Sequence, residues 1–144
     1  MAKAKLRTRR PFLTVAQQHF FVGQFFPRFE FSGRAGAGDW VGYLQPTEFS
    51  RRYKVKIQYR VKTPPKIWVV SPALHPKAPH RFDDGSLCVY WAREGDWGPD
   101  MPFHETIIPW VAEWLFYYEM WLDTGKWLGS SSHASSDWPK SLEA

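Results

Sequence analysis

Residues 52–62 have the sequence Arg-Tyr-Lys-Val-Lys-Ile-Gln-Tyr-Arg-Val-Lys, in which apolar and polar side chains alternate throughout. Successive side chains of a strand point to opposite faces, so this period of two predicts one strand with an apolar face and a basic face. The apolar face would carry Tyr53, Val55, Ile57, Tyr59 and Val61. Other elements of the chain must therefore cover that face.

Three further stretches have strand character, at residues 29–32, 40–44 and 67–70. Gly33, Gly36 and Gly38 predict a flexible turn between the first two of these strands. Four strands at hairpin-length spacing predict an antiparallel meander.

Two helices flank the predicted strands. The first is expected over residues 14–26, after the capping residue Thr14 and before Pro27. The second is expected from Thr106 to a stop at Gly125, because its apolar residues follow helical spacing. Its acidic residues are expected on the opposite, outer side: Glu113, Glu119 and Asp123. The order predicts an α+β fold with helices on one side of the sheet.

Composition limits the class of protein. The chain has 144 residues, of which 44% are hydrophobic and 23% charged, as in a folded domain. No apolar run approaches the roughly 20 residues of a membrane-spanning helix, and no signal-peptide pattern follows the N-terminus. Cys88 is the only cysteine, which excludes an internal disulfide and a multi-cysteine zinc site. We expect a cytoplasmic protein that does not associate with membranes and has no cofactor.

The positive charge lies mainly in an arm. Five of the 19 basic residues fall in the first ten, which leaves 14 basic against 14 acidic residues in the rest. We therefore divide the chain into a basic flexible arm (1–13), a folded domain (14–128) and a Ser-rich tail (129–144). Within the domain, residues 51–66 carry seven basic side chains and no acid, whereas residues 83–123 carry nine acids. Such opposed faces can orient a charged partner.

Residues 72–104 form a long segment with five prolines, which is expected to be an ordered, packed loop because it also holds five aromatic residues: Phe82, Tyr90, Trp91, Trp97 and Phe103. This loop contains Cys88, with histidines at 75, 80 and 104. A lone cysteine is most often a small buried hydrophobe, but nearby histidines can serve as a base for a nucleophilic thiol.

Four strings in this order resemble the E2 (ubiquitin-conjugating enzyme) family. Residues 64–69, Pro-Pro-Lys-Ile-Trp-Val, resemble its Pro-Pro-Lys-Val strand opening, and residues 74–77, Leu-His-Pro-Lys, its His-Pro-Asn motif. Residues 85–88, Gly-Ser-Leu-Cys, resemble its Gly-x-Ile-Cys segment, and residues 97–99, Trp-Gly-Pro, its Trp-Ser-Pro. The resemblance implies an E2/UBC-like fold in which 14–128 is the catalytic domain and 72–104 the active-site loop.

Residues 80–91, 114–121 and 124–127 resemble, more narrowly, bacterial E2 proteins encoded beside cGAS/DncV-like nucleotidyltransferases in cyclic-oligonucleotide antiphage (CBASS) operons. The chain has no room for an E1-like adenylating domain, so it resembles the stand-alone E2 of short type II systems. The resemblance implies a cysteine transferase. Cys88 would form a thioester with the C-terminal tail of the nucleotidyltransferase, and an amine of an acceptor protein would then attack it.

The resemblance has two departures that bear on the candidate residues. Lys77 stands where the family has the Asn of His-Pro-Asn, and the interval from His75 to Cys88 is three residues longer than usual. His80, eight residues before Cys88, is therefore a second candidate base beside His75. Backbone N–H groups of residues 85–88 are candidate oxyanion donors.

Three alternatives remain at the level of the sequence. The chain could be an E2 for a separate bacterial ubiquitin-like modifier, or a catalytically inactive E2-like binding subunit in which Cys88 only packs. A nucleic-acid-binding module is the least favoured, because the domain is neutral and Tyr53 and Tyr59 lie on the strand face opposite the charges. We expect no nucleic-acid partner.

Overall fold

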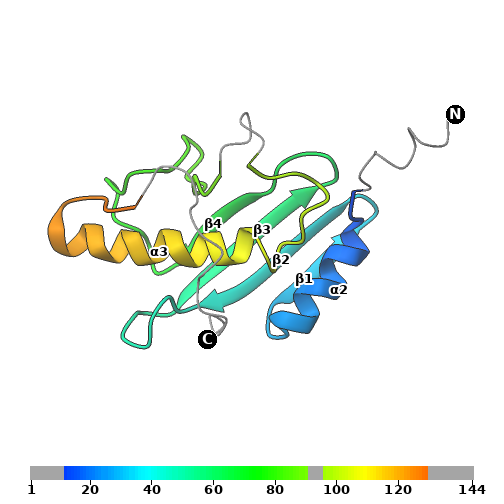
Figure 1. The fold of residues 1–144 in the computed structure, drawn as a ribbon, viewed down its shortest axis with the longest axis horizontal. Helices are drawn as coiled ribbons and strands as arrows, with labels where there is room; N and C mark the ends of the chain where they lie inside the picture. The colour runs from blue at the N-terminus through cyan, green and yellow to red at the C-terminus, as the bar shows by residue number, and fades with distance from the viewer. Residues whose placement is uncertain (1–11, 91–95, 130–144) are drawn as a thin grey trace, which may run out of the picture.

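The computed structural model describes residues 12–90 and 96–129. Most of the predicted arm and tail, and Trp91 of the long loop, lie outside these ranges. The elements are, in order, α2 (Val15–Phe25), β1 (Glu30–Arg34), β2 (Ala37–Leu44), β3 (Tyr53–Arg60), β4 (Lys66–Ser71) and α3 (Ile107–Thr124). The strands form one antiparallel sheet in the order β1-β2-β3-β4 (Figure 1). The predicted α+β fold with a four-stranded meander is confirmed.

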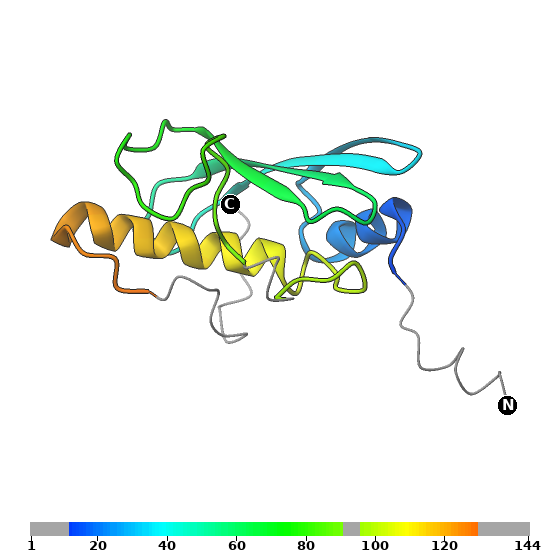
Figure 2. The ribbon, with the colours of Figure 1, turned by 90° about the horizontal axis from the view of Figure 1, so that it is seen from above.

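Both helices lie on the same face of the sheet (Figure 2). The inward side chains of β3 explain this arrangement, because Tyr53, Val55, Ile57 and Tyr59 are at most 2% exposed. Ile57 pairs with Trp40 on β2 and with Ile67 on β4, so the core continues across three strands. The hydrophobic free energy gained by burying this one apolar face is the main contribution that holds the helices against the sheet.

The predicted glycine turn is wrong in its extent. Only residues 35 and 36 connect β1 to β2, and Gly36 has a φ of 73°. Gly33 and Gly38 pair with each other inside the ladder. The Phe31 ring lies over Gly33, and the Trp40 and Phe31 rings both lie against Gly38, so that a Cβ at either position would crowd an aromatic ring. These glycines therefore serve close packing under an aromatic ring.

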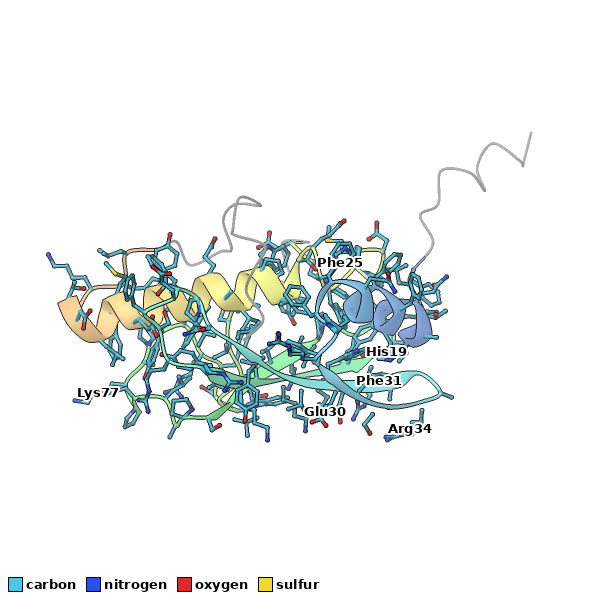
Figure 3. The ribbon with its side chains drawn as sticks, turned by 90° about the horizontal axis from the view of Figure 1, so that it is seen from below. His19, Phe25, Glu30, Phe31, Arg34 and Lys77 are labelled. Carbon is cyan, nitrogen blue, oxygen red and sulfur yellow. The ribbon has the colours of Figure 1, made fainter. Side chains whose placement is uncertain are left out.

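Helix α2 begins as predicted at the cap Thr14, whose side chain and that of Gln17 form a reciprocal capping box. The helix contacts β1 through the His19 ring, which stacks on the Phe31 ring at 4.0 Å between centroids. Figure 3 shows this pair between the helix and the sheet, with Glu30 and Arg34 on the opposite side.

Helix α3 ends as predicted at Gly125, which adopts the left-handed conformation. The expected outer position of two of its acids is wrong. Glu113 is 7% exposed, and Glu119 accepts hydrogen bonds from Ser50 Oγ at 2.6 Å and Tyr53 Oη at 2.8 Å. The helix is covered on more than one side, because the segment between β2 and β3 also reaches it.

The long segment from 72 to 104 is packed, as predicted, at Tyr90, Trp97 and Phe103, each at most 5% exposed. Phe82 departs from the prediction, because it is 48% exposed. Within residues 12–90 and 96–129, no helix is both long and apolar enough to cross a bilayer.

Gln18 ties this segment to α2. Its side chain is fully buried, and its Nε2 donates to the Met101 carbonyl at 3.0 Å while its Oε1 accepts the Phe103 N–H at 2.9 Å. Two backbone groups of the loop thus find their partners in one side chain, and removing it would leave both unpaired.

We expect Gln18→Ala to lower the free energy of unfolding by about 3 kcal/mol, since it leaves two buried backbone groups without partners. Gln24→Ala is the matched control, because it makes the same change on the same helix at an exposed position, and it should stay within about 0.5 kcal/mol. Urea denaturation of both variants measures the difference. Equal losses would show that the Gln18 hydrogen bonds add nothing.

Candidate active site around Cys88

A short hairpin leads into Cys88. Arg81 and Leu87 form its bridge, and its turn closes with the Gly85 N–H donating to the Phe82 carbonyl at 2.9 Å. Gly85 has a φ of 85°, a conformation that glycine adopts without strain. The Leu87 N–H donates to the Ile67 carbonyl at 2.8 Å, so the hairpin is docked on the edge strand β4.

Asp84 holds the turn and the strand together. Its Oδ1 accepts the Ser86 N–H at 2.9 Å and the Ser86 hydroxyl at 2.6 Å, and its Oδ2 lies 2.8 Å from Lys66 Nζ. Its carbonyl accepts the Trp68 Nε1–H at 3.2 Å. Hydrogen bonds from Lys66 and Ser86 keep the pKa of Asp84 well below its usual range, so the carboxylate stays charged.

Cys88 lies at the exit of this hairpin, and it is 8% exposed. Its N–H donates to the His80 carbonyl at 2.9 Å, and its Sγ lies 3.9 Å from the Tyr90 carbonyl oxygen. Tyr90 is itself held, because its hydroxyl donates to the Pro65 carbonyl. Burial raises the pKa of the Cys88 thiol, so the thiol is protonated near neutral pH.

The structure joins His80 to Cys88 through this backbone hydrogen bond, and within the described residues no hydrogen bond joins the His80 imidazole to the Cys88 thiol. The His80 carbonyl also accepts the Trp114 Nε1–H at 3.0 Å, and its ring packs 4.8 Å from that of Trp127. Its φ of 57° is unusual for a side chain with a Cβ. Burial lowers the pKa of the imidazole, so the ring is neutral near pH 7 and can accept a proton.

His75 has a different setting. Its Nδ1 accepts the Lys77 N–H at 3.0 Å, and its own N–H donates to the Tyr118 hydroxyl at 2.9 Å. Its ring meets Trp121 edge-on at 5.3 Å. These contacts shape the loop, and no hydrogen bond within the described residues joins His75 to Cys88. Lys77 projects away from the body of the protein (Figure 3).

The predicted oxyanion donors are already in use. The N–H groups of residues 85, 86, 87 and 88 donate to Phe82, Asp84, Ile67 and His80 respectively. The prediction is therefore wrong for this conformation, because forming and docking the hairpin takes up all four donors.

Sequence reasoning did not identify the Lys66–Asp84–Trp68 contacts. The Asp84-Gly85 pair is a turn signal, and it could have pointed to the hairpin. Its partners lie on β4, 16 and 18 residues earlier, and nothing local indicates them. In the described part of the chain, no three His, Cys, Asp or Glu side chains cluster as a metal site would require.

The basic side chains of β3 lie on the sheet face that the helices leave open. Lys54, Lys56 and Arg60 alternate with the buried residues along the strand, as predicted. Arg60 lies 3.7 Å from the Asp39 carboxylate on the neighbouring strand. The face is therefore basic and only partly neutralised along its own strands.

The family model described as Type II CBASS E2 protein matches residues 18–134. The matched range includes the whole sheet, Cys88 and α3. No curated protein matches the chain.

The burial of Cys88 predicts slow alkylation by iodoacetamide. At pH 7 we expect the folded protein to react at least about tenfold more slowly than the same chain in urea, since few thiolates form. The rate should keep rising above the usual thiol pKa of about 8.5, because the raised pKa delays ionisation. Cys88 is the only cysteine, so intact mass reports it directly and Cys88→Ser supplies the background. A rate that levels off below pH 8 would contradict this picture.

Proposed function

The chain belongs to the family of type II CBASS E2 proteins, and on this premise we propose that it is an E2-like acyltransferase with Cys88 as its nucleophile. Cys88 accepts the activated C-terminal acyl group of a cGAS/DncV-like nucleotidyltransferase as a thioester and passes it to an amine of an acceptor protein. This transfer primes antiphage cyclic-nucleotide signalling.

The observation that carries the proposal is the position of the single cysteine. Cys88 follows a hairpin that two β4 side chains and one β4 carbonyl hold in place, in a chain whose family is E2. A nucleophile needs a fixed backbone so that its sulfur meets the carbonyl in one geometry.

The chemistry has two steps. The Cys88 thiol first passes its proton to a base as its sulfur attacks the activated carbonyl, a C–S bond replaces the bond to the leaving group, and the leaving group takes up the proton. The amine nitrogen then attacks the thioester, the C–S bond breaks, an amide forms and the thiolate leaves. The amine gives up a proton, for which a neutral imidazole is a suitable acceptor.

His80 is the candidate base. The His80 carbonyl accepts a hydrogen bond from the Cys88 N–H. Burial lowers the pKa of the His80 imidazole and so keeps the ring neutral near pH 7. His75 takes a structural role in this account, since its Nδ1 already accepts the Lys77 N–H.

The basic face of β3 favours a partner protein with an acidic surface. Lys54, Lys56 and Arg60 lie on the open side of the sheet, where a protein surface rich in carboxylates would meet complementary charge.

One observation favours a second candidate function, an inactive E2-like binding subunit. Cys88 is 8% exposed and the neighbouring N–H groups are occupied, as in a cysteine that only packs. The protein would then act by binding the nucleotidyltransferase, and its function would not depend on the Cys88 thiol.

Intact mass spectrometry after coexpression with the neighbouring nucleotidyltransferase separates the two functions. The proposal expects a thiol-sensitive adduct on wild type, none on Cys88→Ala, and a stable ester on Cys88→Ser, because the hydroxyl of serine forms the less reactive bond. A tight complex without any adduct, unchanged in Cys88→Ala, would contradict catalysis.

The same measurement distinguishes the histidines. His80→Asn should slow adduct formation about 100-fold, the usual contribution of a general base, and Asn tolerates the positive φ of this position. His75→Asn is the matched control, which should stay within about threefold since the amide oxygen can accept the Lys77 N–H. Equal effects of both substitutions would exclude the assigned role of His80.

A further inference from the structure

The segment between β2 and β3 presents an aromatic side chain to solvent. Phe49 is 90% exposed, the largest exposed fraction of any large apolar side chain in the described ranges. In Figure 1 this connection extends beyond the end of the sheet. A single exposed apolar side chain on a mobile loop needs no explanation. On a loop whose backbone is fixed, the ring cannot turn inward and stays exposed.

Hydrogen bonds within the segment fix its shape. The Ser50 N–H donates to the Thr47 carbonyl at 3.0 Å, and the Thr47 N–H donates to Ser50 Oγ at 3.0 Å. Thr47 Oγ1 accepts the N–H of Phe49 itself at 3.2 Å. Gln45 Nε2 donates to the Ser50 carbonyl at 2.9 Å and closes the loop at its base.

A further contact fastens the segment to the core. Ser50 Oγ donates to Glu119 Oε1 at 2.6 Å, and Glu119 Oε2 accepts the hydroxyl of Tyr53, which is 2% exposed. The loop is thus held to α3 by a carboxylate with two partners. An exposed aromatic ring on a fixed loop loses little conformational entropy when it binds.

The surroundings of Phe49 are basic and aromatic. Arg51 and Arg52 are exposed, and the Arg52 guanidinium lies 4.7 Å from the centre of the Tyr43 ring, itself 38% exposed. Tyr43 pairs with Lys54 across the strands, which adds a third cation at this end of the sheet. Tyr and Arg are enriched among the few residues that carry most of the binding energy at protein interfaces.

We propose that residues 45–52, together with Tyr43, form a docking surface for a folded protein partner, with Phe49 as the central anchor. The complementary surface is an apolar pocket rimmed by carboxylates, which meet Arg51 and Arg52. The identification of this partner with the nucleotidyltransferase rests on the proposed function.

A second copy of this chain fits the surface poorly. A two-fold symmetric contact would place the same patch against itself. Three cations, Arg51, Arg52 and Lys54, would then face each other with Glu48 as the one exposed acid of the segment. Repulsion between these like charges disfavours a symmetric dimer through this surface, whereas an acidic partner would be attracted to it.

Titration calorimetry of the full chain with the nucleotidyltransferase of the same operon tests the inference. Phe49→Ala should weaken binding about 30-fold, the effect of a central aromatic anchor. Phe20→Ala is the matched control, because Phe20 is 60% exposed on α2, away from the segment, and it should change affinity less than twofold. Arg52→Glu should weaken binding and reduce its salt dependence. All three positions are exposed, so thermal unfolding should confirm that the variants fold.

Each contrary result overturns the inference in a distinguishable way. Equal affinities of wild type and Phe49→Ala would exclude the anchor, while a Cys88 adduct in the same samples would leave the proposed function standing. No binding by wild type, together with no Cys88 adduct, would exclude both. Self-association of wild type that Phe49→Ala abolishes would assign the surface to a second copy. Phe49-dependent binding to phosphatidylserine-containing vesicles would assign it to a membrane.

Discussion

The docking of the Arg81–Leu87 hairpin on strand β4 decides where the only cysteine of the chain lies. One backbone hydrogen bond, from Leu87 to Ile67, aligns the hairpin with the strand, and Asp84 fixes its turn to the Lys66 ammonium and the Trp68 indole. The sheet makes this docking possible, because its apolar face is covered by both helices and its β4 edge is left open for the returning loop. The position of the candidate nucleophile thus depends on one short turn held to an edge strand.

The same docking limits the chemistry of the site as it stands. Burial keeps the thiol protonated through a raised pKa, and every N–H from 85 to 88 already has an acceptor. A reaction at Cys88 therefore needs a base for the thiol proton and a source of stabilisation for the developing oxyanion that is not among these four groups. In our proposal the neutral imidazole of His80 is the base that accepts the thiol proton. The second need, stabilisation of the oxyanion, falls in our proposal to the docked partner.

The features that the sequence predicted correctly are those with local causes. The alternation predicted over residues 52–62, the cap at Thr14 and the stop at Gly125 each follow from the properties of neighbouring residues. The structure confirms the cap, the stop and the alternation over residues 53–60, but the strand ends before Lys62, which has a φ of 69°. The E2 strings predicted a family that the comparison confirms. The errors have distant causes. Gly33 pairs inside the ladder because a ring packs on it, and Glu119 turns inward because Tyr53, 66 residues earlier, offers a hydroxyl. Hydrogen bonds of this range leave no pattern in a single sequence.

The reactivity of Cys88 in two neighbouring variants tests most directly whether the docked hairpin controls this site. Asp84→Asn weakens the contacts to Lys66 and Ser86, whereas Asp83→Asn makes the same change at an exposed neighbour. Alkylation at a fixed pH, followed by intact mass, should be about tenfold faster in Asp84→Asn, because the hairpin opens more often, and unchanged in Asp83→Asn. Equal rates in wild type and both variants would contradict the account, since the thiol would then be shielded by something other than the docked turn.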